Sequence, residues 1–127
     1  MNQFLTLVLI ATLPLAAVAT ESCGEKAAHL LVEKQIEPLS TMFTDQPNLQ
    51  PALKEMIEKV GALSDVQEVS GPRFKQHRRM AVGRASGDYL GYWINAKSEK
   101  LGAVQFHVAQ LPGSACTVLA IQLDVGL

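Results

Sequence analysis

The feature that most constrains the fold of this chain is a single change in the spacing of its apolar residues, which falls at Gly61. Before Gly61, apolar residues recur every three or four positions, which predicts helices with one buried face. After Gly61, apolar and polar residues alternate, which predicts strands with one face on a core. Helices followed by short-linked strands predict an α+β fold, with the helices packed on an antiparallel sheet.

Two helical segments are predicted in the first half of the chain. The first covers residues 25–43, and Pro38 is expected to end or kink it near Glu37 because proline has no amide hydrogen to donate. The second covers residues 51–60, where a proline in the first turn and a glycine just past the end suit a helix. Its predicted buried face consists of Leu53, Met56, Ile57 and Val60.

Four to five strands are predicted in the second half, joined in chain order as a curved antiparallel meander. The predicted strands cover residues 63–69, 73–83, 88–96, 104–109 and 115–125. The predicted turns, rich in glycine, proline and polar residues, cover residues 70–73, 86–88, 97–100 and 111–114. Alternation predicts that the last strand buries Thr117, Leu119, Ile121, Leu123 and Val125.

The first nineteen residues have the composition of a secretory signal peptide. They are almost wholly apolar from Phe4 onward, they carry no charge, and residues 17–19 form an A-x-A cleavage pattern. A membrane anchor is disfavoured, because the run is short for a span and Pro14 interrupts it. We therefore expect a signal peptide at 1–19, one α+β domain at 20–127, and a secreted or periplasmic protein with no stable membrane span after cleavage.

The chain contains two cysteines, Cys23 and Cys116. In an exported protein an even pair predicts one disulfide, here between the start of the domain and the last strand. A catalytic thiol is the weaker interpretation, because no histidine partner stands at a suitable spacing.

Basic residues are concentrated in one predicted strand. The formal net charge is only −1, which argues against a general nucleic-acid binder. A candidate partner patch nevertheless consists of Arg73, Lys75, Arg78 and Arg79. Such a strand could meet an acidic partner protein, an anionic ligand or a membrane surface. The competing interpretation is an exposed edge strand whose charges prevent pairing with other chains.

Charge is scarce in the C-terminal part of the chain, where Asp124 is the only charged residue from Leu101 to Leu127. Strands with so little charge are expected to be covered on both faces. A helix would cover one face, and the other would line a pocket, form a homodimer interface or belong to a filled core.

Three ring-bearing residues make a candidate ligand pocket: Tyr89, Trp93 and His107. They stand on strand positions that can share one sheet face, and aromatic side chains there can form a binding platform or simply anchor a core. The sequence has no GxSxG, no phosphate-binding loop and no HExxH, so neither catalytic residues nor a metal or cofactor is predicted.

The stretch QEVSG at 67–71 matches the pattern Gln-x-Val-x-Gly between a helical region and strand-like sequence. In element order, residues 25–125 resemble the cystatin-like superfold, which includes cystatins and the nuclear-transport-factor-2-like cone proteins. The segment 60–66 is similar to the junction between helix and first strand in both groups. The resemblance implies a helix held by a curved sheet, and in the cone proteins a pocket between them.

For a cystatin, the resemblance implies a protease-inhibiting wedge. Gln67, Val69 and Gly71 would form its inhibitory hairpin, Gly24 its N-terminal glycine, and residues 111–113 its second hairpin, which here has proline but no tryptophan. The same residues also fit the end of a strand that runs into a turn. The sequence thus favours an exported, non-catalytic binding protein for a protein partner or small ligand. The alternatives are an inhibitor of a protease, secreted toxin or hydrolase, and a small pocket enzyme of the cone type.

Overall fold

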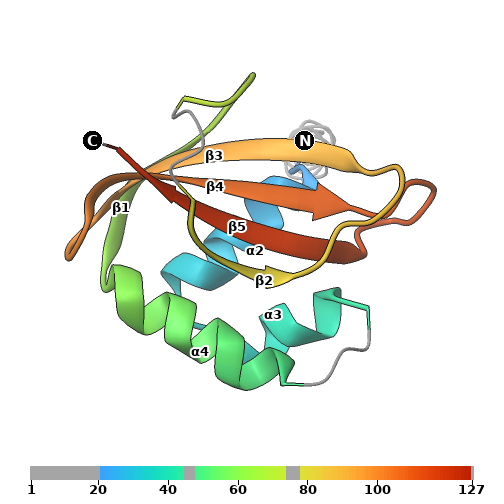
Figure 1. Cartoon of the computed structure of the whole chain (residues 1–127), viewed down its shortest axis with the longest axis horizontal. Helices are drawn as coiled ribbons and strands as arrows, with labels where there is room; N and C mark the ends of the chain where they lie inside the picture. Colours follow the sequence, from blue (N-terminus) through green and yellow to red (C-terminus); the bar gives the residue numbers. More distant parts are fainter. Residues whose placement is uncertain (1–20, 45–47, 74–77, 127) are drawn as a thin grey trace, which may run out of the picture.

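The computed structural model describes residues 21–44, 48–73 and 78–126, in which three helices cover one face of a five-stranded antiparallel sheet (Figure 1). The helices are α2 (Cys23–Val32), α3 (Ile36–Met42) and α4 (Leu49–Val60). The strands are β1 (Leu63–Val69), β2 (Arg78–Gly83), β3 (Leu90–Ser98), β4 (Gly102–Gln110) and β5 (Val118–Val125). The predicted α+β class is confirmed, with all helices before all strands.

The first predicted helix is divided earlier than expected. Ser22 caps α2 through a capping box with Glu25, and the chain breaks after Val32, where Lys34 takes a left-handed φ of 57°. Pro38 is the third residue of α3, where the amide has no acceptor inside the helix, so proline is tolerated. The predicted break near Glu37 is therefore wrong.

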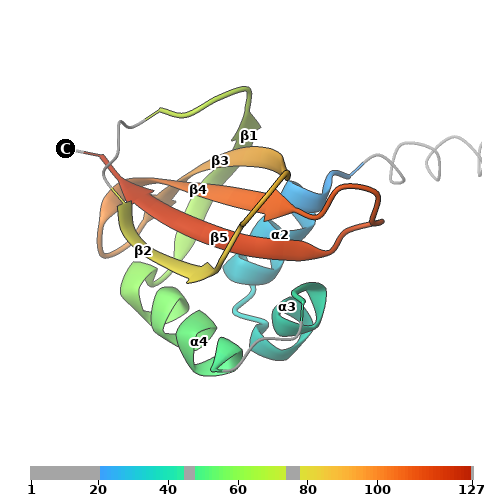
Figure 2. The ribbon, with the colours of Figure 1, turned by 45° about the vertical axis from the view of Figure 1, so that its right-hand side comes forward.

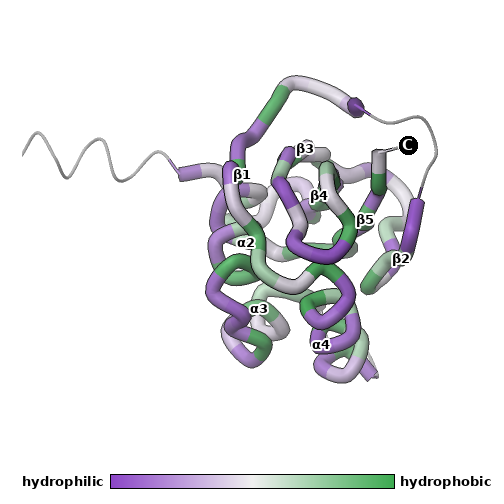
Figure 3. Tube along the Cα trace, turned by 90° about the vertical axis from the view of Figure 1, so that its left-hand side faces the viewer, coloured by the Kyte–Doolittle hydropathy of each residue, from purple (hydrophilic) through white to green (hydrophobic). Residues whose placement is uncertain are grey.

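Helix α4 matches its prediction closely. Its four predicted core residues are all buried, and Gly61 ends the helix with a φ of 68°. Figure 3 shows the three helices on one side of the sheet, with the strands above them. Within the described ranges, no helix has both the length and the apolar character needed to cross a membrane.

The order of strands in the sheet is β1-β3-β4-β5-β2. Strands β3, β4 and β5 form a meander, and the turns predicted at 97–100 and 111–114 connect them. The hairpins predicted at 70–73 and 86–88 are wrong, because β1 and β2 lie at opposite edges of the sheet. The connection from β1 to β2, described as far as residue 73, and residues 84–89 are instead crossovers, and Figure 2 shows the second one running from β2 back to β3.

The helix-facing side of the sheet supplies half of the core. Cross-strand pairs place Ile94, Phe106 and Leu123 in one row, and all three are buried. The pairing of β4 with β5 shifts register between Ala109 and Gln110 of β4, which leaves Leu119 as the extra residue on β5. Val118 therefore pairs with Gln110 and is buried, while Leu119 is only partly buried. The predicted burial of Thr117 and Leu119 is corrected by this bulge, which reverses the alternation at that end of the strand.

The other side of the sheet, called here the open face, carries the alternate residues of each strand. Gln105 of β4 is fully buried there because the first crossover runs over it. Its Oε1 accepts the amide N–H of Arg73 at 2.8 Å, and its Nε2 donates to Asn95 Oδ1 at 2.7 Å and to the Gly71 carbonyl at 3.3 Å. A single glutamine thereby fixes the segment that carries the chain from one edge of the sheet toward the other.

Candidate functional site

A hollow of about 290 Å³ lies on the open face, bounded by β2, β4, β5 and the second crossover. Its floor is a row of residues with little or no side chain, since Gly83 pairs with Ala120 and Ala120 pairs with Ala109. A Cβ on Gly83 would lie 2.3 Å from the Leu119 carbonyl oxygen, and its φ of 81° also disfavours a side chain. Glycine at position 83 therefore lets the backbones of β2 and β5 approach closely at the floor of the hollow.

The rim of the hollow is polar and basic. Arg78 at the start of β2, Arg84 just after its end, Tyr89 of the crossover and Gln122 of β5 line it. Neither arginine forms an ion pair with any residue that the structure describes. The two guanidinium groups are therefore available to solvent or to a ligand.

Three rings form a cluster beside this hollow. Trp93 stacks on His107 with ring centroids 4.7 Å apart and planes 22° apart, and Tyr89 meets the same imidazole edge-on at 5.7 Å. A Cβ on Gly91 would lie 2.7 Å from His107 Nε2, so the glycine makes room for the histidine on the neighbouring strand. The imidazole is thus enclosed by two rings and a bare stretch of backbone.

The packing around His107 favours the neutral form of its imidazole. Burial lowers the pKa of His107 below its ordinary value of 6.5, and the nearby carboxylate of Asp124 opposes part of the effect. Nε2 is buried and has no hydrogen-bond partner among the described residues. Asp124 is itself buried and accepts a hydrogen bond from Gln122 Nε2 at 2.9 Å.

The structure brings the three residues of the candidate ligand pocket together, although only two of them line the hollow. Tyr89 and His107 do so, whereas Trp93 supports His107 from the side of β3. Sequence reasoning missed the contributions of Gln122 and of the small residues in the floor. The signal that was present is the recurrence of glycine or alanine at outward-facing positions of neighbouring strands.

The basic patch is distributed over two elements. Arg73 lies in the first crossover, Arg78 and Arg79 are exposed on β2, and Lys75 falls outside the described residues. Strand β2 is an edge strand, as the alternative interpretation of its charges required.

The wedge implied by the cystatin resemblance is not assembled. Gln67 and Val69 belong to edge strand β1. Gly71 lies in the first crossover, where its carbonyl oxygen accepts a hydrogen bond from Gln105 Nε2. Gly24 is buried in α2, where a Cβ would lie 2.5 Å from Tyr92 Cβ. The inhibitory hairpin at Gln67, Val69 and Gly71 is therefore absent, since β1 does not pair with β2.

The charge-poor strands β4 and β5 are covered by helices on one face and partly by the crossovers on the other. Both strands have both edges paired within the sheet. A second copy of the chain can therefore reach them only through the open face.

A second surface feature is an apolar tip at one end of the sheet. The exposed large apolar residues of the described chain gather there: Tyr89, Leu90 and Leu111, which are 44%, 48% and 40% exposed. Leu90 pairs with Gln110, and Leu111 is the next residue after Gln110, so Leu90 and Leu111 lie at the same end of the sheet.

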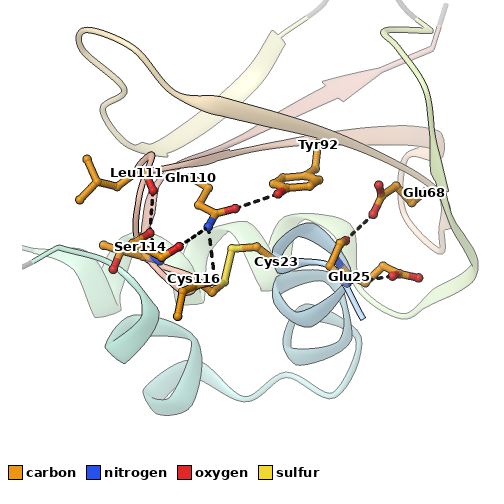
Figure 4. The surroundings of a disulfide bond; sticks show 11 residues. Cys23, Glu25, Glu68, Tyr92, Gln110, Leu111, Ser114 and Cys116 are labelled. Atoms are coloured by element: carbon orange, nitrogen blue, oxygen red, sulfur yellow. Dashed lines mark hydrogen bonds between the residues drawn. A yellow bond between two sulfur atoms is a disulfide. The ribbon is translucent and has the colours of Figure 1, made fainter. Parts of the chain in front are cut away.

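The loop that carries Leu111 is fixed from several sides (Figure 4). The predicted disulfide between Cys23 and Cys116 is present and ties the loop to α2. Gln110 Nε2 donates to the carbonyl oxygen of Ser114 at 3.0 Å, and its Oε1 accepts from the Tyr92 hydroxyl at 2.8 Å. The apolar tip is therefore presented by a preorganised loop.

No family model matches the chain, and neither a curated protein nor a solved structure matches it.

Proposed function

We propose that this protein is an exported, non-catalytic binding protein that holds a small ligand in the hollow on its open face. The observation that carries the proposal is the combination of a side-chain-free floor with a polar rim in one concave site. Small-ligand sites are concave and use a few precisely placed polar groups to fix the orientation of the ligand. The hollow is at the small end of the usual size range, which favours a ligand of few atoms.

Binding is favoured over catalysis by the state of His107. Its Nε2 is out of contact with solvent and packs against Gly91, so a substrate entering the hollow does not reach this nitrogen. A general base must lie within hydrogen-bond reach of the proton that it removes. The imidazole is better suited to support the wall of a binding site.

Export is supported by two features of the chain. The apolar leader at 1–19 has a cleavage pattern before Thr20, and the Cys23–Cys116 disulfide suits an oxidising compartment. Intact-mass measurement of the protein from the medium or the periplasm should give a chain that begins at Thr20. A chain retained in the cytoplasm with its leader would contradict this part of the proposal.

The binding site can be tested by filling it. Fragments that stabilise the wild-type protein in a thermal-shift screen should lose their effect in Ala120→Trp, which places an indole on the floor of the hollow. Ala103→Trp is the matched control, because Ala103 is exposed on β4 and does not line the hollow. Equal stabilisation of all three proteins by every fragment would refute the site.

The second candidate function is binding of a protein partner, including inhibition of a hydrolase, through the apolar tip. It is favoured by the concentration of exposed apolar residues on a loop already fixed by a disulfide, since a preorganised loop loses little entropy on binding. Leu111→Asp should weaken such a partner strongly while Ala103→Asp leaves it unaffected. Binding of fragments in the hollow, unaffected by Leu111→Asp, would separate this function from the first.

A further inference from the structure

The charge around the hollow determines what kind of ligand can enter it, provided that the proposed ligand-binding function holds. Among the residues that the structure describes, Arg78 and Arg84 are the charged ones in its lining, and none of the described carboxylates lines it. The nearby acid, Asp124, is 5% exposed and already bound by Gln122. A concave site with cations at its rim and no lining anion concentrates negatively charged solutes.

The two arginines are not equivalent. Arg78 is the cross-strand partner of Asp124, so that carboxylate offsets part of its field. Arg84 follows Gly83 at the other end of β2 and begins the crossover that reaches Tyr89. Because six residues of extended chain span roughly 20 Å, the two side chains approach the hollow from opposite ends. Arg84 therefore carries the less compensated positive charge.

The shape of the site beside Arg84 suits a planar group. Ala120 presents only a methyl group from the floor beside Gly83, Ala109 is buried behind it, and the rings of Tyr89 and His107 stand at the wall. A flat apolar body can lie on such a floor against the rings, while a charged group at its end reaches a guanidinium. Guanidinium donors form two parallel hydrogen bonds with carboxylate and phosphate oxygens.

We propose that the hollow binds a small organic anion, with its carboxylate, phosphate or sulfonate group at Arg84 and its planar apolar body on the floor at Gly83 and Ala120. The recognising chemistry is shared by free aromatic acids and by phosphorylated or sulfonated aromatic compounds. The three charged groups differ in geometry and charge, so parallel titrations distinguish the sources.

The test compares probes of the same shape and different charge by isothermal titration calorimetry on the mature protein. Benzoate and benzamide differ chiefly in the charge of one group, and phenyl phosphate and benzenesulfonate extend the series. Benzoate should bind at least tenfold more tightly than benzamide, and the stronger of phenyl phosphate and benzenesulfonate indicates the natural charged group. Acetate, which lacks the ring, should bind at least tenfold more weakly than benzoate.

Two arginine variants carry the decision. Arg84→Gln should weaken benzoate by about ten- to a hundredfold, the usual cost of a lost charge-assisted hydrogen bond. Arg79→Gln removes the same charge from the same strand at an exposed position outside the lining, and it should leave benzoate binding within about twofold of wild type.

Three outcomes overturn the inference. They are benzamide binding as tightly as benzoate, equal effects of Arg84→Gln and Arg79→Gln, and no binding of any of the three aromatic anions at millimolar concentration. Failure of the anion inference is distinguished from failure of the binding function by Ala120→Trp. If neutral fragments bind the wild type and lose binding in Ala120→Trp, the hollow is a ligand site for uncharged molecules.

Discussion

Gln105 offers the sharpest test of the topology, because its side chain holds the first crossover against the sheet. Gln105→Ala removes three hydrogen bonds, to the Arg73 amide, the Gly71 carbonyl and the Asn95 side chain. At about 1 kcal/mol of net stability for each bond, we expect a loss of about 2 to 4 kcal/mol in the free energy of unfolding. A domain of this kind has about 5 to 15 kcal/mol in total, so the loss is large.

The assay is urea denaturation combined with amide hydrogen exchange. Gln122→Ala is the matched control, because Gln122 lies on the adjacent strand of the same face and makes one side-chain hydrogen bond, to Asp124. It should cost about 1 kcal/mol. In Gln105→Ala the Arg73 amide should also exchange much faster than in the control. Equal stabilities for the two variants, with unchanged protection at Arg73, would refute the role given to Gln105.

Three further predictions concern the rest of the molecule. Replacing Cys23 and Cys116 by alanine should lower the free energy of unfolding by about 4 to 5 kcal/mol, because the disulfide spans 93 positions of the chain. Urea denaturation midpoints with and without reductant measure this loss. Gly83→Ala should lower the free energy of unfolding by at least about 2 kcal/mol, whereas Gly87→Ala, with a similar φ but open space around it, should lower it by about 1 kcal/mol. Equal losses of stability in urea denaturation would contradict the close packing at Gly83. The pKa of His107 is lowered in the folded state, so the unfolded chain binds more protons at pH values near 6.5. The free energy of unfolding should therefore fall as the pH drops from 7 through 6.5 toward the lowered pKa. NMR titration of the imidazole checks the direction of the shift, and a pKa above 6.5 would contradict it.

The sequence predicted which way side chains face better than which strands meet. Alternation correctly identified Ile121, Leu123 and Val125 of the last strand as buried, because a face depends only on the local period of two. Pairing depends on the path of the connections, and residues 70–73 and 86–88 contain glycine and serine just as the true turn at 111–114 does. The path of the first crossover over the open face depends on contacts such as the hydrogen bond from Gln105 to the Gly71 carbonyl oxygen. Such contacts join residues far apart in sequence, so no local sequence pattern predicts them.

The candidate site was predictable to a similar degree. Tyr89, Trp93 and His107 were identified as rings on one face, and the structure brings them together. Arg84 becomes part of a hollow only because the second crossover folds back over β5, so its role could not be predicted from a basic stretch read as a strand. The floor of the hollow could not be predicted, because a glycine or alanine indicates a hollow only when the residues paired with it on neighbouring strands are also small, and those pairs are not known from the sequence.

The strand order also has a consequence for how the chain folds. Strands β3, β4 and β5 are joined by short turns and can pair early. The two edge strands, β1 and β2, pair with residues that are distant in sequence, such as Leu63 with Ser98 and Met80 with Leu123, and such pairing is slower. One continuous segment, residues 63–83, supplies both edge strands. A partly folded chain in which only β3, β4 and β5 are paired has two unpaired edges, and unpaired edges are sites for association with other chains. Variants that weaken the crossover should therefore refold with a lower yield at high protein concentration, beyond what their loss of equilibrium stability accounts for.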